Sequence, residues 1–190
     1  MKKKLMTVLA LVLVIAMSVA GTYAYLTSTY SVKNTFTVGN VAITMDEAKV
    51  DAYGNVLNGE DAGRDVKNTY KLIPGHEYTK DPTIHVTQGS EPCYVFAKIE
   101  NGLAGVSTID IDTTKWEALG NGVYAYKTTV DAREAAQNVV VFEHFTFTGS
   151  DPTNYETTNA NDVNITVTGY AVQAEGFDNA QAAWNATFGK

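Results

Sequence analysis

Apolar and polar residues alternate along several stretches of the chain, and this alternation is the feature that most limits its fold. The pattern is clearest in Cys93–Glu100 and in Val163–Ala174. Successive side chains of a β-strand point to opposite faces, so a period of two predicts strands with one buried face. Further strands are expected at Thr37–Met45, Pro82–Gln88, Val123–Thr128 and Val139–Thr148.

Turn residues separate these stretches and complete an all-β pattern. Gly120-Asn121-Gly122 is a tight turn, so residues 114–128 are interpreted as a hairpin. About eight strands with broad loops between them are typical of a sandwich of two sheets. The sequence therefore predicts an all-β, jelly-roll-like two-sheet β-sandwich.

The last segment of the chain changes to a helical period. Its apolar residues are Ala180, Ala183, Trp184 and Phe188, and Asp178 is placed to cap the first turn. We expect a short C-terminal helix that covers one end of the sandwich.

The first 24 residues have the three parts of a secretory signal peptide, which predicts a signal-peptide helix ahead of the sandwich. Lys2–Lys4 form a cationic head, an apolar run follows to about Ala20, and small residues come next. Thr22 and Ala24 are small and two apart, so cleavage is expected after Ala24, with Tyr25 as the new first residue.

An uncleaved membrane anchor is the alternative interpretation of this segment. The uncharged window from Leu5 to Val32 exceeds the roughly 20 apolar residues that cross a bilayer. However, its strongly apolar part ends near Ala20, and no positive cluster follows. A lipoprotein signal is excluded, because the only cysteine, Cys93, lies far from the apolar run.

Cleavage would release a polar, weakly alternating arm, Tyr25–Phe36, that is compatible with a strand. We therefore predict a signal peptide at 1–24, an N-terminal arm at 25–36 and a β-sandwich domain at 37–190. Within the arm, the candidate donor-strand residues are Tyr25, Leu26, Thr27, Ser28, Tyr30 and Val32.

The charge of the chain limits its partners. Removing 24 of 190 residues leaves 166, and the loss of three lysines takes the net charge from -7 to -10. This acidity argues against binding nucleic acid or an anionic membrane surface. Contact with a membrane is expected only through the signal segment. With one cysteine, Cys93, the chain has no internal disulfide, and Cys93 is expected to be a small buried side chain.

The sequence motifs assign no catalytic, cofactor-binding or metal-binding residue, and no cofactor is expected. His76-Glu77 begins like an HExxH zinc motif, but position 80 holds Lys80, and the stretch follows a Pro-Gly turn instead of lying on a helix. Nothing in the spacing of His85 and His144 brings them to His76. A Ser/His/Asp triad stays open, although no GxSxG elbow supports one.

The acidic loop at residues 51–68 invites comparison with a calcium site. It lacks the alternating ligands and the terminal Glu of an EF-hand, so a solvated loop is expected.

Two runs near the N-terminus resemble a known family. GTYAYLT at Gly21–Thr27 and NTFTVGNVAIT at Asn34–Thr44 are similar to the TasA/camelysin (CalY) family, exported proteins of Gram-positive bacteria whose signal peptides are cut by the peptidase SipW. Weaker similarity continues through Leu72–His76, Tyr94–Ile99 and the C-terminal strand and helix. The resemblance implies a jelly-roll domain, export and assembly into biofilm-matrix fibres, in which the arm of one subunit completes a sheet of the next.

Three functions are consistent with this resemblance. The favoured one is a secreted structural protein of the cell surface or biofilm matrix. Its partners would be copies of itself in a head-to-tail polymer or related matrix proteins, with signal peptidase acting during export. A camelysin-like metallo-endopeptidase is the enzyme alternative. A surface adhesin or carbohydrate-binding module is the third, for which Tyr124 and Tyr126 are expected to be exposed.

Overall fold

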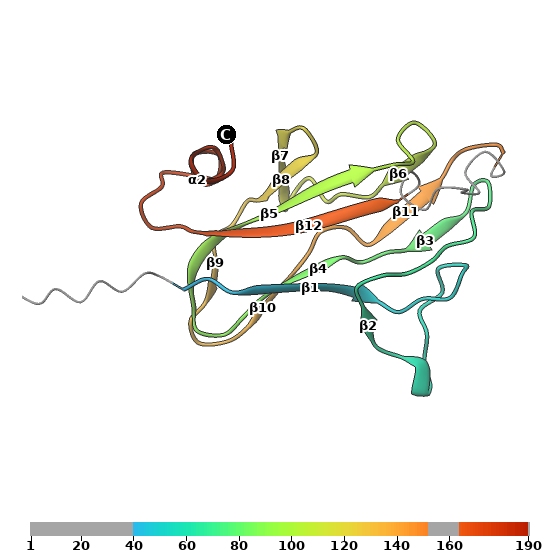
Figure 1. Cartoon of the computed structure of the whole chain (residues 1–190), viewed down its shortest axis with the longest axis horizontal. Helices are drawn as coiled ribbons and strands as arrows, with labels where there is room; N and C mark the ends of the chain where they lie inside the picture. The colour runs from blue at the N-terminus through green and yellow to red at the C-terminus, as the bar shows by residue number, and fades with distance from the viewer. Residues whose placement is uncertain (1–39, 152–163, 190) are drawn as a thin grey trace, which may run out of the picture. The chain divides into compact units, whose positions relative to one another are not determined.

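Twelve β-strands and one α-helix make up the part of the chain that the computed structural model describes, residues 40–151 and 164–189 (Figure 1). These residues belong to one compact unit, Val38–Lys190. The strands are β1 (Ile43–Ala48), β2 (Arg64–Asp65), β3 (Glu77–Thr79), β4 (Thr83–Val86), β5 (Ser90–Asn101), β6 (Ser107–Ile109), β7 (Trp116–Gly120), β8 (Val123–Tyr126), β9 (Val130–Ala132), β10 (Gln137–Val140), β11 (His144–Phe147) and β12 (Ile165–Gln173); the helix is α2 (Ala180–Thr187), and Gly59–Asp61 form a 3-10 turn.

The largest sheet has the order β12-β5-β8-β7, and β9 pairs with the start of β5. β12 and β5 lie side by side in Figure 1 and pair antiparallel through nine residues, from Ile165 opposite Asn101 to Gln173 opposite Cys93. Apolar and polar residues alternate in both strands, so a single pairing register places the apolar residues of both strands on the same face.

The predicted hairpin at residues 114–128 is confirmed as β7 and β8. Its turn holds Asn121 at φ 53° and Gly122 at φ 75°, the left-handed values that a two-residue hairpin turn needs. A Cβ at Gly122 would lie 2.5 Å from the carbonyl oxygen of Ile99, so the turn also needs glycine for close approach.

The remaining strands form two more antiparallel sheets, β10-β4-β1-β2 and β3-β11-β6, giving three sheets where the sequence predicted two. The extra sheet continues the β4–β10 pair. The Val141 amide donates to Pro82 O (2.9 Å), and the Lys80 amide donates to Glu143 O (3.0 Å). These two bonds bridge the break between β3–β11 and β4–β10.

One apolar core lies between the four-stranded and five-stranded sheets. Ile84 and Val86 of β4 belong to the same buried cluster as Val95 of β5 and Trp116 of β7, whose indole nitrogen donates to Val140 O (3.1 Å). Cys93 is fully buried in this cluster, and burial raises the pKa of its thiol to about 11. The expected buried cysteine is therefore confirmed.

The expected C-terminal helix is confirmed as α2, which packs on the outer face of the five-stranded sheet. Ala183 is buried there against Phe96, and Trp184 packs beside them. The cap is not Asp178, as predicted. The side chain of Asn179 accepts from the Ala182 amide (2.9 Å) because the helix begins one residue later than the pattern indicated. Nowhere in the described part of the chain is a helix long and apolar enough to cross a membrane.

Candidate functional site

Among the described residues, β12 is an edge strand whose second edge is open. Its partner is β5, and no other strand among residues 40–151 and 164–189 pairs with it. At nine residues it is the longest edge strand of the described sheets. An open strand edge is a row of main-chain donors and acceptors ready to receive another strand.

The ladder geometry identifies which groups of β12 face outward. The amide of Ala174 donates to Pro92 O, and the amide of Gly102 donates to Asn164 O, each at 2.8 Å. In an antiparallel pair, residues that exchange hydrogen bonds alternate with residues that do not. The even-numbered residues of β12 therefore bond to β5, and the main-chain groups that face away belong to Ile165, Val167, Gly169, Ala171 and Gln173.

Apolar surface lies beside this open edge. Ile165, Val167 and Ala171 are partly buried and pack on the main core. A Cβ on Gly169 would lie 2.9 Å from Ile84 Cγ1, so β12 crosses the opposite sheet at close range there. A strand added to β12 would extend both the hydrogen-bond ladder and the apolar inner face.

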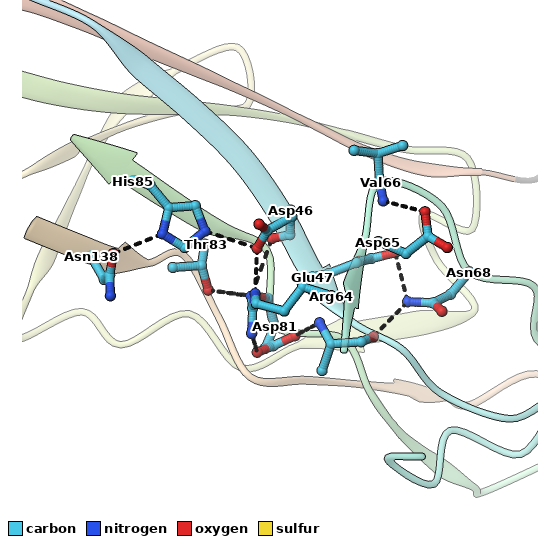
Figure 2. Close-up of polar contacts among 11 residues, drawn as sticks. Asp46, Glu47, Arg64, Asp65, Val66, Asn68, Asp81, Thr83, His85 and Asn138 are labelled. Atoms are coloured by element: carbon cyan, nitrogen blue, oxygen red, sulfur yellow. Dashed lines mark hydrogen bonds and ion pairs between the residues drawn. The ribbon is translucent and has the colours of Figure 1, made fainter. Parts of the chain in front are cut away.

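A second polar feature lies on the outer face of the four-stranded sheet, where β1, β4 and β10 meet (Figure 2). His85 of β4 has both ring nitrogens occupied: Nδ1 lies 2.7 Å from Asn138 Oδ1, and Nε2 lies 2.8 Å from Asp46 Oδ1. Two acceptor oxygens facing one imidazole favour its doubly protonated form.

Arg64 of β2 closes this network from the far side of β1. Its guanidinium donates to the carboxylates of Asp46 and Asp81, with a distance of 2.8 Å to Asp81 Oδ2, and to Thr83 Oγ1, also at 2.8 Å. Asp81 in turn accepts from the Ala48 amide (2.5 Å). One side chain thus ties β2 to β1 and to the start of β4.

Glu47 forms a separate polar contact on the inner face of β1, where it is only 5% exposed. Its Oε2 accepts from Lys80 Nζ (2.6 Å), and its Oε1 accepts from Asn68 Nδ2 (3.0 Å). Asn68 Nδ2 also donates to Ala48 O (2.8 Å). β1 therefore has charged contacts on both faces, and each involves a residue of the 64–68 segment.

The pKa shifts in the outer network follow from these contacts. Burial alone would raise the pKa of Asp46, but the hydrogen bonds from Arg64 and His85 outweigh it and lower the pKa. Burial alone would lower the pKa of His85, yet its bonds to Asp46 and Asn138 raise it above 6.5. Both shifts stabilise the charged pair in the folded state.

The network should make stability depend on pH. The folded pKa of His85 is raised, so its contribution is fully present below pH 6.5 and is lost as the pH rises through the folded value. We expect the free energy of unfolding in urea to fall between pH 5.5 and 8.5 by roughly the net contribution of one hydrogen bond, about 1 kcal/mol. His85→Gln should remove this part of the pH dependence; an identical profile in the variant would contradict the assignment.

The Asp46–His85 pair is not arranged as a catalytic dyad. With Asn138 on one ring nitrogen and Asp46 on the other, His85 has no nitrogen left to accept a proton from a hydroxyl nucleophile. The nearby hydroxyl of Thr83 is itself bonded to Asp81 O and to Arg64. The geometry is that of a structural network that docks β2 on the sheet.

The other histidines have separate partners. His76 Nε2 contacts Tyr53 O (2.9 Å), and His144 Nδ1 contacts Asp110 Oδ2 (3.0 Å). The described ranges contain no group of three or more His, Cys, Asp or Glu side chains that could hold a metal ion. All three histidines and the single cysteine fall within those ranges. The described residues therefore do not fit a zinc site of the His-containing type.

The loop at residues 51–68 uses its first carboxylate for its own backbone. Asp51 Oδ1 accepts from the amides of Tyr53 (2.8 Å) and Asn55 (2.9 Å), and Asp51 Oδ2 accepts from Asn55 Nδ2 (2.9 Å). These hydrogen bonds lower the pKa of Asp51. The loop is thus organised around an Asx-type turn.

The residues predicted for cleavage and strand donation lie outside the described part of the chain. These are Thr22, Ala24 and Tyr25 for cleavage, and Tyr25, Leu26, Thr27, Ser28, Tyr30 and Val32 for the donor strand. They stay predictions.

The expectation that Tyr124 and Tyr126 are exposed is wrong. Both are half-buried against the main core, and Tyr126 contacts Trp116 with ring centroids 5.3 Å apart. On β8 Ala125 packs against α2 on one face of the sheet, and the even positions face the main core, so the tyrosines point toward that core.

Sequence reasoning missed the residues that form the polar network. Arg64 lies in a stretch rich in Gly, Asn and Asp, which is typical of a solvated loop. Asp46 and Glu47 follow the alternating stretch Thr37–Met45 and resemble a polar end to that strand, although both lie within β1. No sequence signal could have found the network, because Asp46 and Asp81 lie 18 and 17 positions from Arg64 and no local pattern joins residues so far apart.

Comparison with known proteins adds one finding. Residues 1–72 match a protein family described as camelysin metallo-endopeptidase, which confirms over these residues the resemblance that the sequence indicated. The matched segment contains β1 and β2, with Asp46, Glu47 and Arg64, but none of the three histidines. Searches of curated proteins and of solved structures found no match to the chain.

Proposed function

We propose that this chain, which is similar to the camelysin family over residues 1–72, is an exported structural protein of the cell surface or biofilm matrix. In this proposal the arm at residues 25–36 of one copy adds to the open edge of β12 in the next copy. The observation that carries it is the nine-residue open edge with apolar side chains beside it.

The dimensions and pattern of the arm suit this edge. At about 3.3 Å per residue, residues 25–36 would span roughly 40 Å as a strand, and β12 spans roughly 30 Å. Leu26, Tyr30 and Val32 share one parity, so a strand would place them on one face, while Thr27 and Thr29 would lie on the other. The apolar face would continue the inner face of β12.

Such an addition is head-to-tail and uses two different surfaces of each copy. A contact of this kind does not close on itself unless its rotation closes a ring, so it supports a filament. We propose a jelly-roll-like sandwich as the unit that polymerises, with signal peptidase cleaving after Ala24 to free the arm. The partners are then other copies of the chain or related matrix proteins.

Blocking the edge tests the acceptor side of this proposal. Val167→Pro removes an outward amide without breaking a bond to β5, because Val167 is one of the residues that do not bond to β5. We expect a folded protein by circular dichroism and no fibres by electron microscopy. Val167→Ala is the matched control, since it truncates the same side chain and keeps the amide; it should form fibres. Fibres in the proline variant would overturn the use of this edge.

The description of the matched family makes a secreted metallo-endopeptidase the second candidate. Against it, the described histidines have separate partners and do not converge. We expect the purified protein to contain less than stoichiometric zinc by elemental analysis and to leave casein intact. Chelator-sensitive cleavage of casein, lost in a His76→Ala or His144→Ala variant, would establish the peptidase instead.

A further inference from the structure

A groove lies beside α2 on the outer face of the five-stranded sheet. It has a volume of about 600 Å³ and runs between α2 and the β7–β8 turn. Its lining includes Lys98, Asn121, Tyr170, Gln181, Trp184 and Asn185. This volume is in the range of sites that hold small organic ligands.

Aromatic rings form one wall of the groove. Trp184 contacts Tyr170 edge-on with ring centroids 5.3 Å apart, and it contacts Phe188 at 4.8 Å. Phe188 is 37% exposed although it is a large apolar side chain. These rings hold one another in place and present an apolar surface to whatever occupies the groove.

Polar side chains with no hydrogen-bond partner among the described residues line the same space. Neither the indole nitrogen of Trp184, nor the hydroxyl of Tyr170, nor the amide of Asn121 hydrogen-bonds to any residue in the described ranges, and none of these atoms is buried. Gln181 Nε2 donates to Asn185 Oδ1 (3.0 Å), which leaves the carbonyl oxygen and one N–H of Gln181 and both N–H groups of Asn185. The groove therefore offers donors and acceptors together.

Among the described residues that line it, the groove has no unpaired charge. Its one charged side chain is Lys98, whose Nζ lies 2.9 Å from Glu100 Oε1 on the same strand. The chain as a whole is acidic, with a net charge of -7, so an anionic ligand would be repelled.

We propose that this groove binds a neutral oligosaccharide. A sugar ring has an apolar face of C–H groups that packs on an aromatic ring, and a rim of hydroxyls that each donate and accept. Amide side chains match hydroxyls in this respect, because they also donate and accept. The combination of Trp184 and Phe188 with Asn121, Gln181 and Asn185 provides both kinds of contact. This inference is independent of fibre assembly.

Titration of the purified protein with a panel of neutral and acidic oligosaccharides tests the proposal. Trp184 lines the groove and Trp116 is 2% exposed in the core, so tryptophan fluorescence should report binding through Trp184. We expect at least one neutral glucan or galactan oligosaccharide to shift the emission at millimolar concentration, and polygalacturonate to leave it unchanged. A panel in which no neutral sugar shifts the emission, or in which only acidic sugars do, overturns the proposal.

A double variant locates the site. Gln181→Ala with Asn185→Ala removes two exposed amides from α2 and replaces them with a strong helix former, so the fold should persist. Loss of two hydrogen bonds should weaken binding at least about tenfold. Gln137→Ala on β10, an exposed amide that does not line the groove and lies on another sheet, should leave affinity unchanged. Undiminished binding in the double variant overturns the assignment to this groove.

Discussion

Deletion of Tyr25–Val32 is expected to abolish fibre formation and to leave a folded monomer. None of the strands in the described ranges includes these residues, so the sandwich keeps its core without them. The open edge of β12 would then have no donor. Electron microscopy should show fibres for the parent protein and none for the deletion, while circular dichroism and urea unfolding of the two should agree.

A substitution series separates loss of the arm from loss of its apolar face. Leu26→Ser, Tyr30→Ser and Val32→Ser together keep the length of the arm and its proposed cleavage site. Burial of such side chains contributes about 1.5–3 kcal/mol each, so the triple variant should lose more than about a hundredfold in association.

The matched control changes the opposite face of the arm. Thr27→Ala with Thr29→Ala alters residues that the proposed strand would expose, so fibres should persist. Fibres of normal yield in the serine variant, or in the deletion, would contradict the proposal that the arm is the donor strand. If the serine variant and the alanine control lost fibres equally, the arm would act without a defined register.

The strands that could be predicted from sequence are those in which alternation and burial agree. β5 and β12 pair over nine residues because each has its apolar residues at alternate positions. The β7–β8 hairpin followed from its turn, since Asn-Gly accepts the left-handed backbone that few other pairs tolerate. The helix α2 followed from its change of period. In each case the information lies within about ten residues of the element.

The third sheet could not be predicted, because successive residues are buried at the point where an alternating pattern would be expected. The run Val139–Thr148 looks like one strand, yet β10 ends at Val140 and β11 begins at His144. Between them Val141 and Phe142 are both buried, at 0% and 3% exposure. Both side chains belong to the same apolar core, and a flat strand cannot turn two successive side chains to one side, so the ladder breaks at this point.

The polar network was missed for a related reason. A charged residue inside a strand is tolerated when a partner arrives from elsewhere in the chain, as Arg64 does for Asp46 and Lys80 does for Glu47. These pairs join residues 18 and 33 positions apart. Local pattern predicts which side chains are apolar, but not which distant charges will meet.

Lys80→Met is expected to lower the free energy of unfolding by about 3 kcal/mol, since breaking a buried ion pair leaves an uncompensated charge. Lys80 and Glu47 have side chains only 12% and 7% exposed, with 2.6 Å between Nζ and Oε2. Without Lys80, the Glu47 carboxylate keeps only Asn68 among the described side chains. Urea unfolding at pH 7 measures the change.

Two further variants decide whether the burial of the ion pair causes the destabilisation by Lys80→Met. Lys115→Met breaks a pair with Asp112 whose side chains are 60% and 41% exposed, so solvent screens it and the variant should be destabilised much less than Lys80→Met. Adding Glu47→Gln to Lys80→Met removes the stranded charge, so most of the lost stability should return. If the two single variants are equally destabilised, or if the double variant is no more stable than Lys80→Met, then β1 is held by its hydrogen bonds and not by a buried charge pair.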